Sequence, residues 1–324
     1  MVAEGWLDLD PGLIHRTLDW LTARRLERPH RWGSPRSIAP CRSRTRSQLD
    51  QGPLGAPGWA CQTPHAMAAA PPRIFIQPSP GAAPLPFPGE AEHLVRVLRA
   101  RVGDLVIGLD GAGGEHPLRI RACDKRNFEL EPCGDPIHEP APGRAGAPLP
   151  WIEVAVAWPR PNRADDMLDR LTQLGVAAIR PLDCAHAGPQ GLPDDEHKRE
   201  RCLRVLREAC KQARRHWLPQ LHAPCTVEAL LAGPPRAGLA CMDPRAAVGL
   251  PEWIARQPQL ASATGERPLV LCIGPEGGFD ERERAAFATH EPSAPVVLAP
   301  HVLRIETAAE AAAAVAVALL CRSR

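Results

Sequence analysis

The chain has 324 residues, enough for two domains that each bury a core of their own. Its net charge is only +2 at pH 7, so nucleic-acid binding has to be argued from local clusters of basic residues. No apolar run is long enough to span a membrane, and the 11 cysteines include no Cys-x-x-Cys pair, which argues against a disulfide framework or a metal site and favours a reducing cytoplasm.

Residues 1–71 carry Pro, Arg, Ser and Trp in no periodic order, and the run at 36–50 has too few apolar residues to build a core. We predict that this segment is a disordered extension. The acidic residues at 6–20 argue against an organelle-targeting peptide. Met67 stands just before the ordered region and is a candidate for the true translation start.

Residues 72–140 contain short apolar runs separated by Gly, Pro and Asn, which indicate strands at 73–76, 104–110, 118–123 and 128–133. The last two runs alternate apolar and polar residues, as in a half-buried antiparallel sheet. A helix is expected at 92–100, where Arg96 and Arg99 belong to a basic cluster. This cluster is either an RNA contact or an ordinary solvated face.

A Pro-rich stretch at 138–150 indicates a linker, assigned to residues 141–150, and a second domain at 151–324. The apolar run at 151–158 predicts a central strand that ends at Pro159. A helix at 163–174, closed by Gly175, and a strand at 176–182 follow in the βαβ order of a parallel sheet. The next helix, at 195–216, has an apolar stripe and a basic side.

Two strand–loop–helix units follow near the C-terminus. The strand at 268–273 runs into the loop GPEGG, where glycines let the backbone approach a ligand closely, although such a stretch can also be only a tight turn. Asp280 and Glu283 have the spacing of a capping box, and Thr307 and Glu310 repeat it after a strand at 295–299. The alternation of strands and helices predicts an α/β fold.

Six segments in this order, among them EACKQARRHWLP at 208–219, GPEGGF at 274–279 and LRIETA at 303–308, resemble the small-subunit ribosomal RNA uridine N3-methyltransferases of the SPOUT (trefoil-knot) superfamily. The resemblance covers residues 72–320. It implies a PUA-like RNA-binding β-barrel at 72–140, a SPOUT α/β domain with a deep trefoil knot at 151–324, S-adenosylmethionine as methyl donor, and a homodimer. The implied partner is small-subunit ribosomal RNA or the ribosomal particle, in the cytoplasm.

The resemblance also assigns residues to roles. The candidates for cofactor binding are Leu271, Ile273, Gly274, Pro275, Glu276, Gly277, Gly278, Leu298, Ala299, Val302, Leu303 and Thr307. The candidates for RNA binding are Arg96, Arg99, Gln212 and Arg215.

Arg304 and Glu306 are the catalytic candidates, by match to the family's LR-x-ETA motif. The uracil N3 proton must leave, so a cation stabilises the developing anion and a carboxylate or water takes the proton. Alternatives remain for both residues: Arg304 can grip RNA phosphate, and Glu306 can simply favour a helix N-terminus.

The chain departs from the family pattern at Ala299, His301 and Ile305, where the family usually has Gly, Arg and Thr. The retained GPEGG loop and Arg304 favour an enzyme, whereas the departures favour a non-catalytic RNA-binding assembly factor. For the homodimer, the small residues Ala308 and Ala312, with Val315 and Leu319, suggest a contact face on the last helix.

Overall fold

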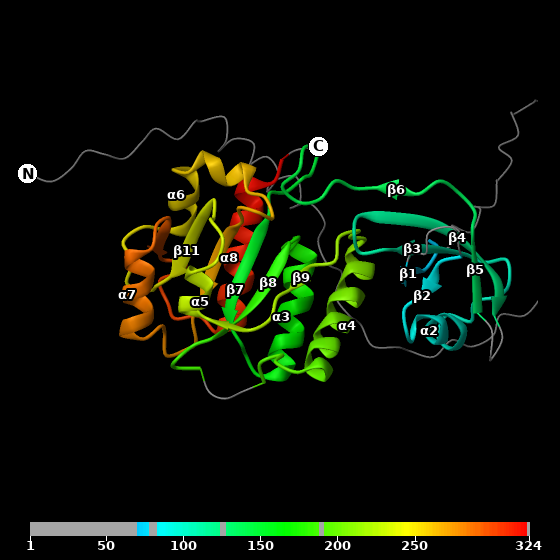
Figure 1. Cartoon of the computed structure of the whole chain (residues 1–324), viewed down its shortest axis with the longest axis horizontal. Helices are drawn as coiled ribbons and strands as arrows, with labels where there is room; N and C mark the ends of the chain where they lie inside the picture. Colours follow the sequence, from blue (N-terminus) through cyan, green and yellow to red (C-terminus); the bar gives the residue numbers. More distant parts are fainter. Residues whose placement is uncertain (1–69, 78–82, 124–127, 188–190, 323–324) are drawn as a thin grey trace, which may run out of the picture. The chain divides into compact units, whose positions relative to one another are not determined.

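Two sheets organise the residues that the computed structural model describes, which are 70–77, 83–123, 128–187 and 191–322 (Figure 1). The disordered extension and the alternative start at Met67 were predicted for a segment that lies outside these residues, except for its last two positions.

The first sheet has six strands in the order β2-β1-β3-β4-β5, with β6 pairing to β4. β1 and β3 are parallel and the other pairs are antiparallel. The core of this sheet is built by Ile74, Ile76, Leu118 and Ile120. The four predicted strands are confirmed. The strands are β1 (Arg73–Gln77), β2 (Leu85–Pro86), β3 (Leu105–Leu109), β4 (Gly114–Cys123), β5 (Phe128–Pro132) and β6 (Ile137–His138).

The helix of this region, α2 (Glu90–Arg96), is shorter than the predicted helix at 92–100. Arg99 adopts a left-handed backbone with φ of 53°, which a continuing helix does not allow. The predicted helix was therefore wrong at its C-terminal end, where the chain turns toward β3.

The second sheet has seven strands, all parallel, in the order β10-β8-β7-β12-β11-β13, with β9 pairing to β8. The central position of β7 is confirmed, and every residue of this strand is buried. The predicted α/β fold is thereby confirmed. The strands are β7 (Ile152–Ala157), β8 (Ala178–Asp183), β9 (Gln220–Leu221), β10 (Cys225–Thr226), β11 (Gly238–Met242), β12 (Leu269–Ile273) and β13 (Ser293–Val296).

Helices cover this sheet and bury its apolar side chains in one large core. α8 packs against β7 and β12 and contacts α3 and α6, while α3 also packs against α4 and α5 against α7. Gly175 closes α3 in a left-handed conformation, as predicted. The helices are α3 (Pro161–Leu174), α4 (Glu196–Ala213), α5 (Val227–Leu231), α6 (Leu250–Ala255), α7 (Glu281–Thr289) and α8 (Ile305–Leu320).

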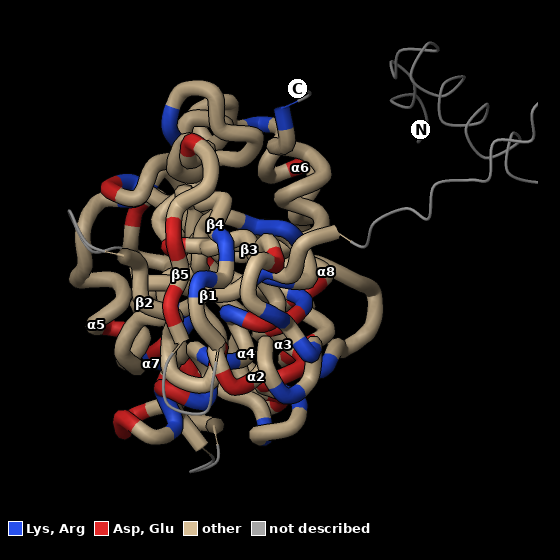
Figure 2. Tube along the Cα trace, turned by 90° about the vertical axis from the view of Figure 1, so that its right-hand side faces the viewer, with Lys and Arg blue, Asp and Glu red and all other residues tan. Residues whose placement is uncertain are grey.

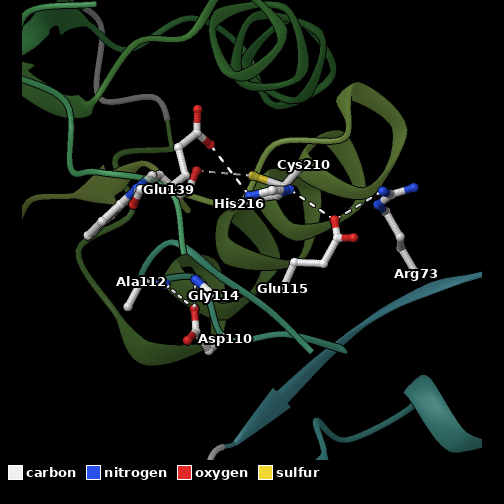
Figure 3. Close-up of polar contacts among 9 residues, drawn as sticks. Arg73, Asp110, Ala112, Gly114, Glu115, Glu139, Cys210 and His216 are labelled. Atoms are coloured by element: carbon white, nitrogen blue, oxygen red, sulfur yellow. Dashed lines mark hydrogen bonds and ion pairs between the residues drawn. The ribbon is translucent and has the colours of Figure 1, made fainter. Parts of the chain in front are cut away.

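Polar contacts join the first sheet to α4 and the residues after it (Figure 3). His216 Nε2 lies 2.9 Å from Oε2 of Glu115, which Arg73 also contacts at 3.1 Å. Lys211, at the end of α4, pairs with the buried Glu90 at 3.0 Å. Because the Lys211 and Glu90 side chains are less than one tenth exposed, this pair is shielded from the solvent that weakens surface ion pairs.

Of the two predicted capping boxes, the one at the start of α7 forms and the one predicted for α8 does not. The capping box of α7 is confirmed, because Asp280 accepts from Glu283 N at 2.7 Å and Glu283 accepts from Asp280 N at 2.8 Å. The box predicted for Thr307 and Glu310 is wrong. α8 begins at Ile305, so Thr307 lies inside its first turn, and β13 also ends earlier than the predicted strand at 295–299.

Within the described part of the chain, no helix combines the length and apolar character needed to cross a membrane. The nine cysteines there are all free thiols. Five of them, Cys184, Cys202, Cys210, Cys241 and Cys272, are buried, and burial raises the pKa of each thiol. These side chains therefore act as small apolar core residues.

Candidate functional site

A cleft of about 340 Å³ opens at the carboxyl ends of β11 and β12. Ligands of parallel α/β sheets bind beyond this edge, because the loops that leave the strands meet there. Three loops form its walls. The lining residues are Met242, Asp243, Pro244, Arg245, Ile273, Gly274, Pro275, Glu276, Gly277, Gly278, Phe279, Arg284, Leu298, Ala299, His301, Val302, Leu303 and Ala308.

The GPEGG loop forms the first wall. It turns back on itself, since the amide of Gly278 donates to the carbonyl of Pro275 at 2.8 Å. Gly278 has a φ of +74°, a conformation that a residue with a Cβ adopts only under strain. Gly277 has an ordinary backbone but a tight neighbour, because an added Cβ would lie 3.3 Å from Cβ of His186.

The loop between β13 and α8 forms the second wall, with Leu298, Ala299, His301, Val302 and Leu303. Val302 is 74% exposed, which is unusual for an apolar side chain next to a cleft. The structure thus brings together ten of the twelve residues predicted to bind a cofactor, all on the first two walls.

The other two predicted cofactor residues lie elsewhere. Leu271 belongs to β12, and its side chain is fully buried in the core. Thr307 is exposed on α8, where it lines a shallow depression with Arg170 and Glu310 of the α3–α8 surface. Leu271 precedes the GPEGG motif and Thr307 belongs to the LRIETA motif. The alternation of side chains along a strand and the turn of a helix direct both side chains away from the cleft.

Sequence reasoning missed the third wall, Met242 to Arg245, which begins at the last residue of β11. Asp243 accepts from Arg245 Nη2 at 2.9 Å, and this hydrogen bond holds the pKa of the Asp243 carboxyl below its usual value. The signal was present, because the apolar run GLACM is followed directly by Asp and Pro. This is the same strand-then-loop pattern as in the other two walls.

The two catalytic candidates have different surroundings. Arg304 is exposed at the N-cap position of α8 and forms no capping hydrogen bond through its side chain. Glu306, one turn into the helix, is only 8% exposed. Its Oε1 lies 3.6 Å from Nε of Arg163 on α3, while its buried Oε2 has no hydrogen-bond partner among the described residues.

Three of the four RNA candidates are accessible. Arg96 and Arg99 are exposed on and after α2, where Arg96 pairs with Glu92 at 2.6 Å, and Gln212 is exposed on α4. Around α2, α3 and α4, Lys and Arg alternate with Asp and Glu (Figure 2). An RNA contact on this side would therefore depend on individual cations.

The fourth RNA candidate, Arg215, forms hydrogen bonds within the protein. Its guanidinium donates to the carbonyls of Thr172 at 3.0 Å and Val176 at 2.7 Å, on either side of the left-handed Gly175 that ends α3. Burial lowers the pKa of this guanidinium. Arg215 thus ties together the two carbonyls that flank the end of α3, and these hydrogen bonds occupy the guanidinium donors that an RNA contact needs.

Comparison with known proteins identifies relatives that match about 70% of the chain. A family model described as an RNA methyltransferase domain matches residues 147–317. The ribosomal RNA small subunit methyltransferase E of Synechocystis is 30% identical over 234 residues, which are 71% of this chain and 71% of the relative. The protein of the same name from Bacillus subtilis is 24% identical over 221 residues, 68% of this chain and 83% of the relative.

Solved structures share the fold. A methyltransferase from Legionella pneumophila, in complex with bound SAM, has a TM-score of 0.64 at 24% identity and covers 76% of this chain and 97% of its own. The ribosomal RNA small subunit methyltransferase E of Neisseria gonorrhoeae, bound to S-adenosyl methionine, has a TM-score of 0.57 at 25% identity and covers 75% and 95%.

Proposed function

We propose, from the fact that this chain belongs to the RNA methyltransferase family, that it transfers a methyl group from S-adenosylmethionine to small-subunit ribosomal RNA, at N3 of a uridine. The observation that carries the proposal is the three-walled cleft, because ten residues predicted from a methyltransferase motif line it together. The methyl acceptor atom is inferred from the resemblance of the sequence motifs to the uridine N3-methyltransferases, and the relatives at 30% and 24% identity are named as small-subunit ribosomal RNA methyltransferases.

The cleft fits S-adenosylmethionine in size and chemistry. Its volume of about 340 Å³ lies in the range of roughly 300–1,000 Å³ that is usual for small-molecule sites. The glycines of the first wall offer backbone groups without a Cβ in the way, and the carboxylate of Asp243 is a hydrogen-bond acceptor on the third wall. Leu298 and Val302 supply apolar contact area on the second wall.

S-adenosylmethionine supplies an already activated methyl group, so the protein's task is to position and to exclude water. Arg304 is exposed beside the cleft, where its charge can meet either the uridine anion or an RNA phosphate. Glu306 is buried and ion-paired, which suits it better to hold a cation than to accept a proton. In this proposal the N3 proton goes to water.

We also propose which residues contact RNA, how the two domains are built and how the chain assembles. Arg96, Arg99 and Gln212 are the proposed RNA contacts, the first sheet acts as a PUA-like RNA-binding barrel at residues 72–140, and the linker is 141–150. A deep trefoil knot in residues 151–324, a homodimer and a cytoplasmic location belong to the same proposal. They are supported by the resemblance to SPOUT methyltransferases.

The dimer face has to be revised. Ala312 is fully buried and Ala308 is 9% exposed inside a single chain, so these two residues cannot form the contact that was predicted for them. The accessible small side chains of α8 are Thr307, Ala311, Ala314 and Ala318, which recur at helical spacing. We place the dimer contact on this second stripe.

Calorimetric titration with S-adenosylmethionine, followed by transfer of a labelled methyl group, tests the proposal. We expect saturable binding of the cofactor and label in small-subunit ribosomal RNA, either naked or in the assembled particle. The departures at Ala299 and His301 lie on the cleft wall and favour the alternative of a non-catalytic RNA-binding assembly factor. That factor would bind the RNA without taking up the cofactor.

A further inference from the structure

A second, smaller cavity of about 320 Å³ adjoins the cleft. Pro275 and Glu276 of the GPEGG loop line both, so a ligand in one would lie across this short segment from a ligand in the other. The residues around the second cavity are Trp158, Pro159, Arg160, Arg163, Ala187, Pro275, Glu276 and Ile305.

The walls of this cavity combine a flat apolar surface with positive charge. Trp158, at the end of β7, is 7% exposed, and Arg160 and Arg163 come from the start of α3. Pro161 occupies the first turn of α3 and fixes the direction in which the helix leaves the strand. A planar ring that carries or develops negative charge is the kind of group that such walls accommodate.

Arg163 forms an ion pair with Glu306 of α8. Its Nε lies 3.6 Å from Oε1 of Glu306, whose side chain is only 10% exposed. Because Oε2 of Glu306 is buried without a hydrogen-bond partner in the described residues, Arg163 is the cation that offsets the cost of burying this carboxylate. The side chain of Arg163 itself is 39% exposed, so its guanidinium remains accessible from the cavity.

We propose that the second cavity receives the acceptor uracil, that Arg163 stabilises the base when N3 loses its proton, and that Glu306 is a positioning residue for Arg163. This inference rests on the proposed function. The N3–H bond breaks and its proton passes to water, while the electron pair stays on N3. That pair then forms the bond to the methyl carbon as the sulfur–methyl bond breaks, and S-adenosylhomocysteine leaves.

The uracil anion spreads its charge over O2, N3 and O4, and a guanidinium presents a planar set of donors to such an arc of acceptors. A cation that interacts only with the anion lowers the pKa of the bound base and accelerates the transfer, whereas it changes cofactor binding little. Arg163 should therefore affect the rate and its pH dependence together.

The test is single-turnover methylation of ribosomal RNA across a pH series, with Arg163→Ala, Arg163→Lys and Glu306→Gln. The matched control is Arg170→Ala, which removes another α3–α8 ion pair, to Glu310 at 2.9 Å, outside the cavity. We expect Arg163→Ala to lower the rate at neutral pH by about a hundredfold or more and to shift the rise of the rate to more alkaline pH. Arg163→Lys should retain part of the rate, and Glu306→Gln should cause a smaller shift in the same direction.

A second readout needs no turnover. With 5-fluorouridine at the nucleotide that the wild-type protein methylates, and S-adenosylhomocysteine in the cleft, the fluorine NMR signal reports the ionisation of N3. The wild-type protein and Arg170→Ala should lower the pKa of the bound base relative to free RNA, and Arg163→Ala should not.

The outcomes separate the inference from the proposed function. A wild-type protein that forms no 3-methyluridine overturns both. A wild-type protein that forms it, with an Arg163→Ala variant whose pH profile and fluorine titration are unchanged, overturns only the assignment of Arg163 and its cavity.

Discussion

Gly277 and Gly278, the last two residues of the GPEGG loop after β12, are required for different reasons. Gly278 needs its positive φ to close the turn to Pro275, and no atom beyond its chain neighbours lies within 4 Å of an added Cβ. Gly277 needs space, since a Cβ added at this position would lie 3.3 Å from the Cβ of His186. The first constraint acts on folding of the loop, and the second acts on the wall of the cleft.

Replacing Gly277 by Val should abolish binding of S-adenosylmethionine, because the branched side chain must either displace His186 or enter the cleft. Calorimetry measures the binding and thermal unfolding checks the fold. The control is Gly134→Val, whose added Cβ meets Pro117 at the same 3.3 Å but lies outside the cleft. Equal loss of binding in both variants would show that the effect is not local.

Replacing Arg304 by Ala distinguishes its two possible roles, since the residue is exposed beside the cleft. If Arg304 stabilises the transition state, the single-turnover rate at saturating RNA falls by about a hundredfold. If it grips phosphate, that rate is kept and the Michaelis constant for RNA rises steeply with salt. An unchanged rate together with an unchanged Michaelis constant would remove Arg304 from the site.

A half-buried histidine, His222, makes stability depend on pH. Burial lowers the pKa of His222, whose Nε2 lies 3.7 Å from the buried Glu153. Between this lowered pKa and the ordinary value of about 6.5, the unfolded chain binds more protons than the folded chain. Stability should therefore fall as the pH drops below about 6.5. Urea unfolding of His222→Gln should show a weaker decline, and the exposed His197→Gln should not.

At the scale of the elements, the sequence predicted strands well and helix starts unevenly. Asp280 stands directly before α7 and can accept from the backbone three residues on, so the local pattern was sufficient. At α8 the pattern Thr-x-x-Glu was present, but Ile305 is 5% exposed and Arg304 already has an extended backbone, so the helix begins two residues before Thr307. Packing of Ile305 outweighed a capping motif that sequence alone could not reject.

The two candidate caps predict different losses of stability. Asp280→Ala should lower the free energy of unfolding by about 1 kcal/mol, because the amide of Glu283 loses its acceptor. Thr307→Ala, at an exposed position inside α8, should change it by less than about 0.5 kcal/mol. Denaturant unfolding at one pH compares the two variants. A larger loss for Thr307→Ala would restore the predicted cap.

For the whole molecule, the order of motifs allowed the α/β fold and two walls of the cleft to be predicted. The third wall, Met242 to Arg245, was missed because β11 is separated from β12 by α6 and more than twenty residues, and only strand pairing brings their ends together. Arg163 was missed for the same reason, since its contact with Glu306 joins segments far apart in the chain. The dimer face was wrong because periodicity alone does not tell which side of α8 the sheet covers.

The revised dimer face gives a prediction for assembly. Ala311→Arg should convert the proposed dimer into a folded monomer, because the residue lies on the accessible stripe of α8. Ala312→Arg should instead lower stability by placing a charge in the core, and Ala288→Arg on the exposed side of α7 should change neither property. Sedimentation and thermal unfolding together separate these cases. A wild-type monomer, or a dimer that survives Ala311→Arg, would contradict this face.

The identity of the methylated nucleoside tests the proposed activity more directly than any other measurement. Small-subunit ribosomal RNA that lacks the modification is incubated with the protein and S-adenosylmethionine with an isotopically labelled methyl group, digested to nucleosides and analysed by mass spectrometry. We predict labelled 3-methyluridine, formed in a single position of the RNA. Label in another nucleoside, or no label despite cofactor binding, would contradict it.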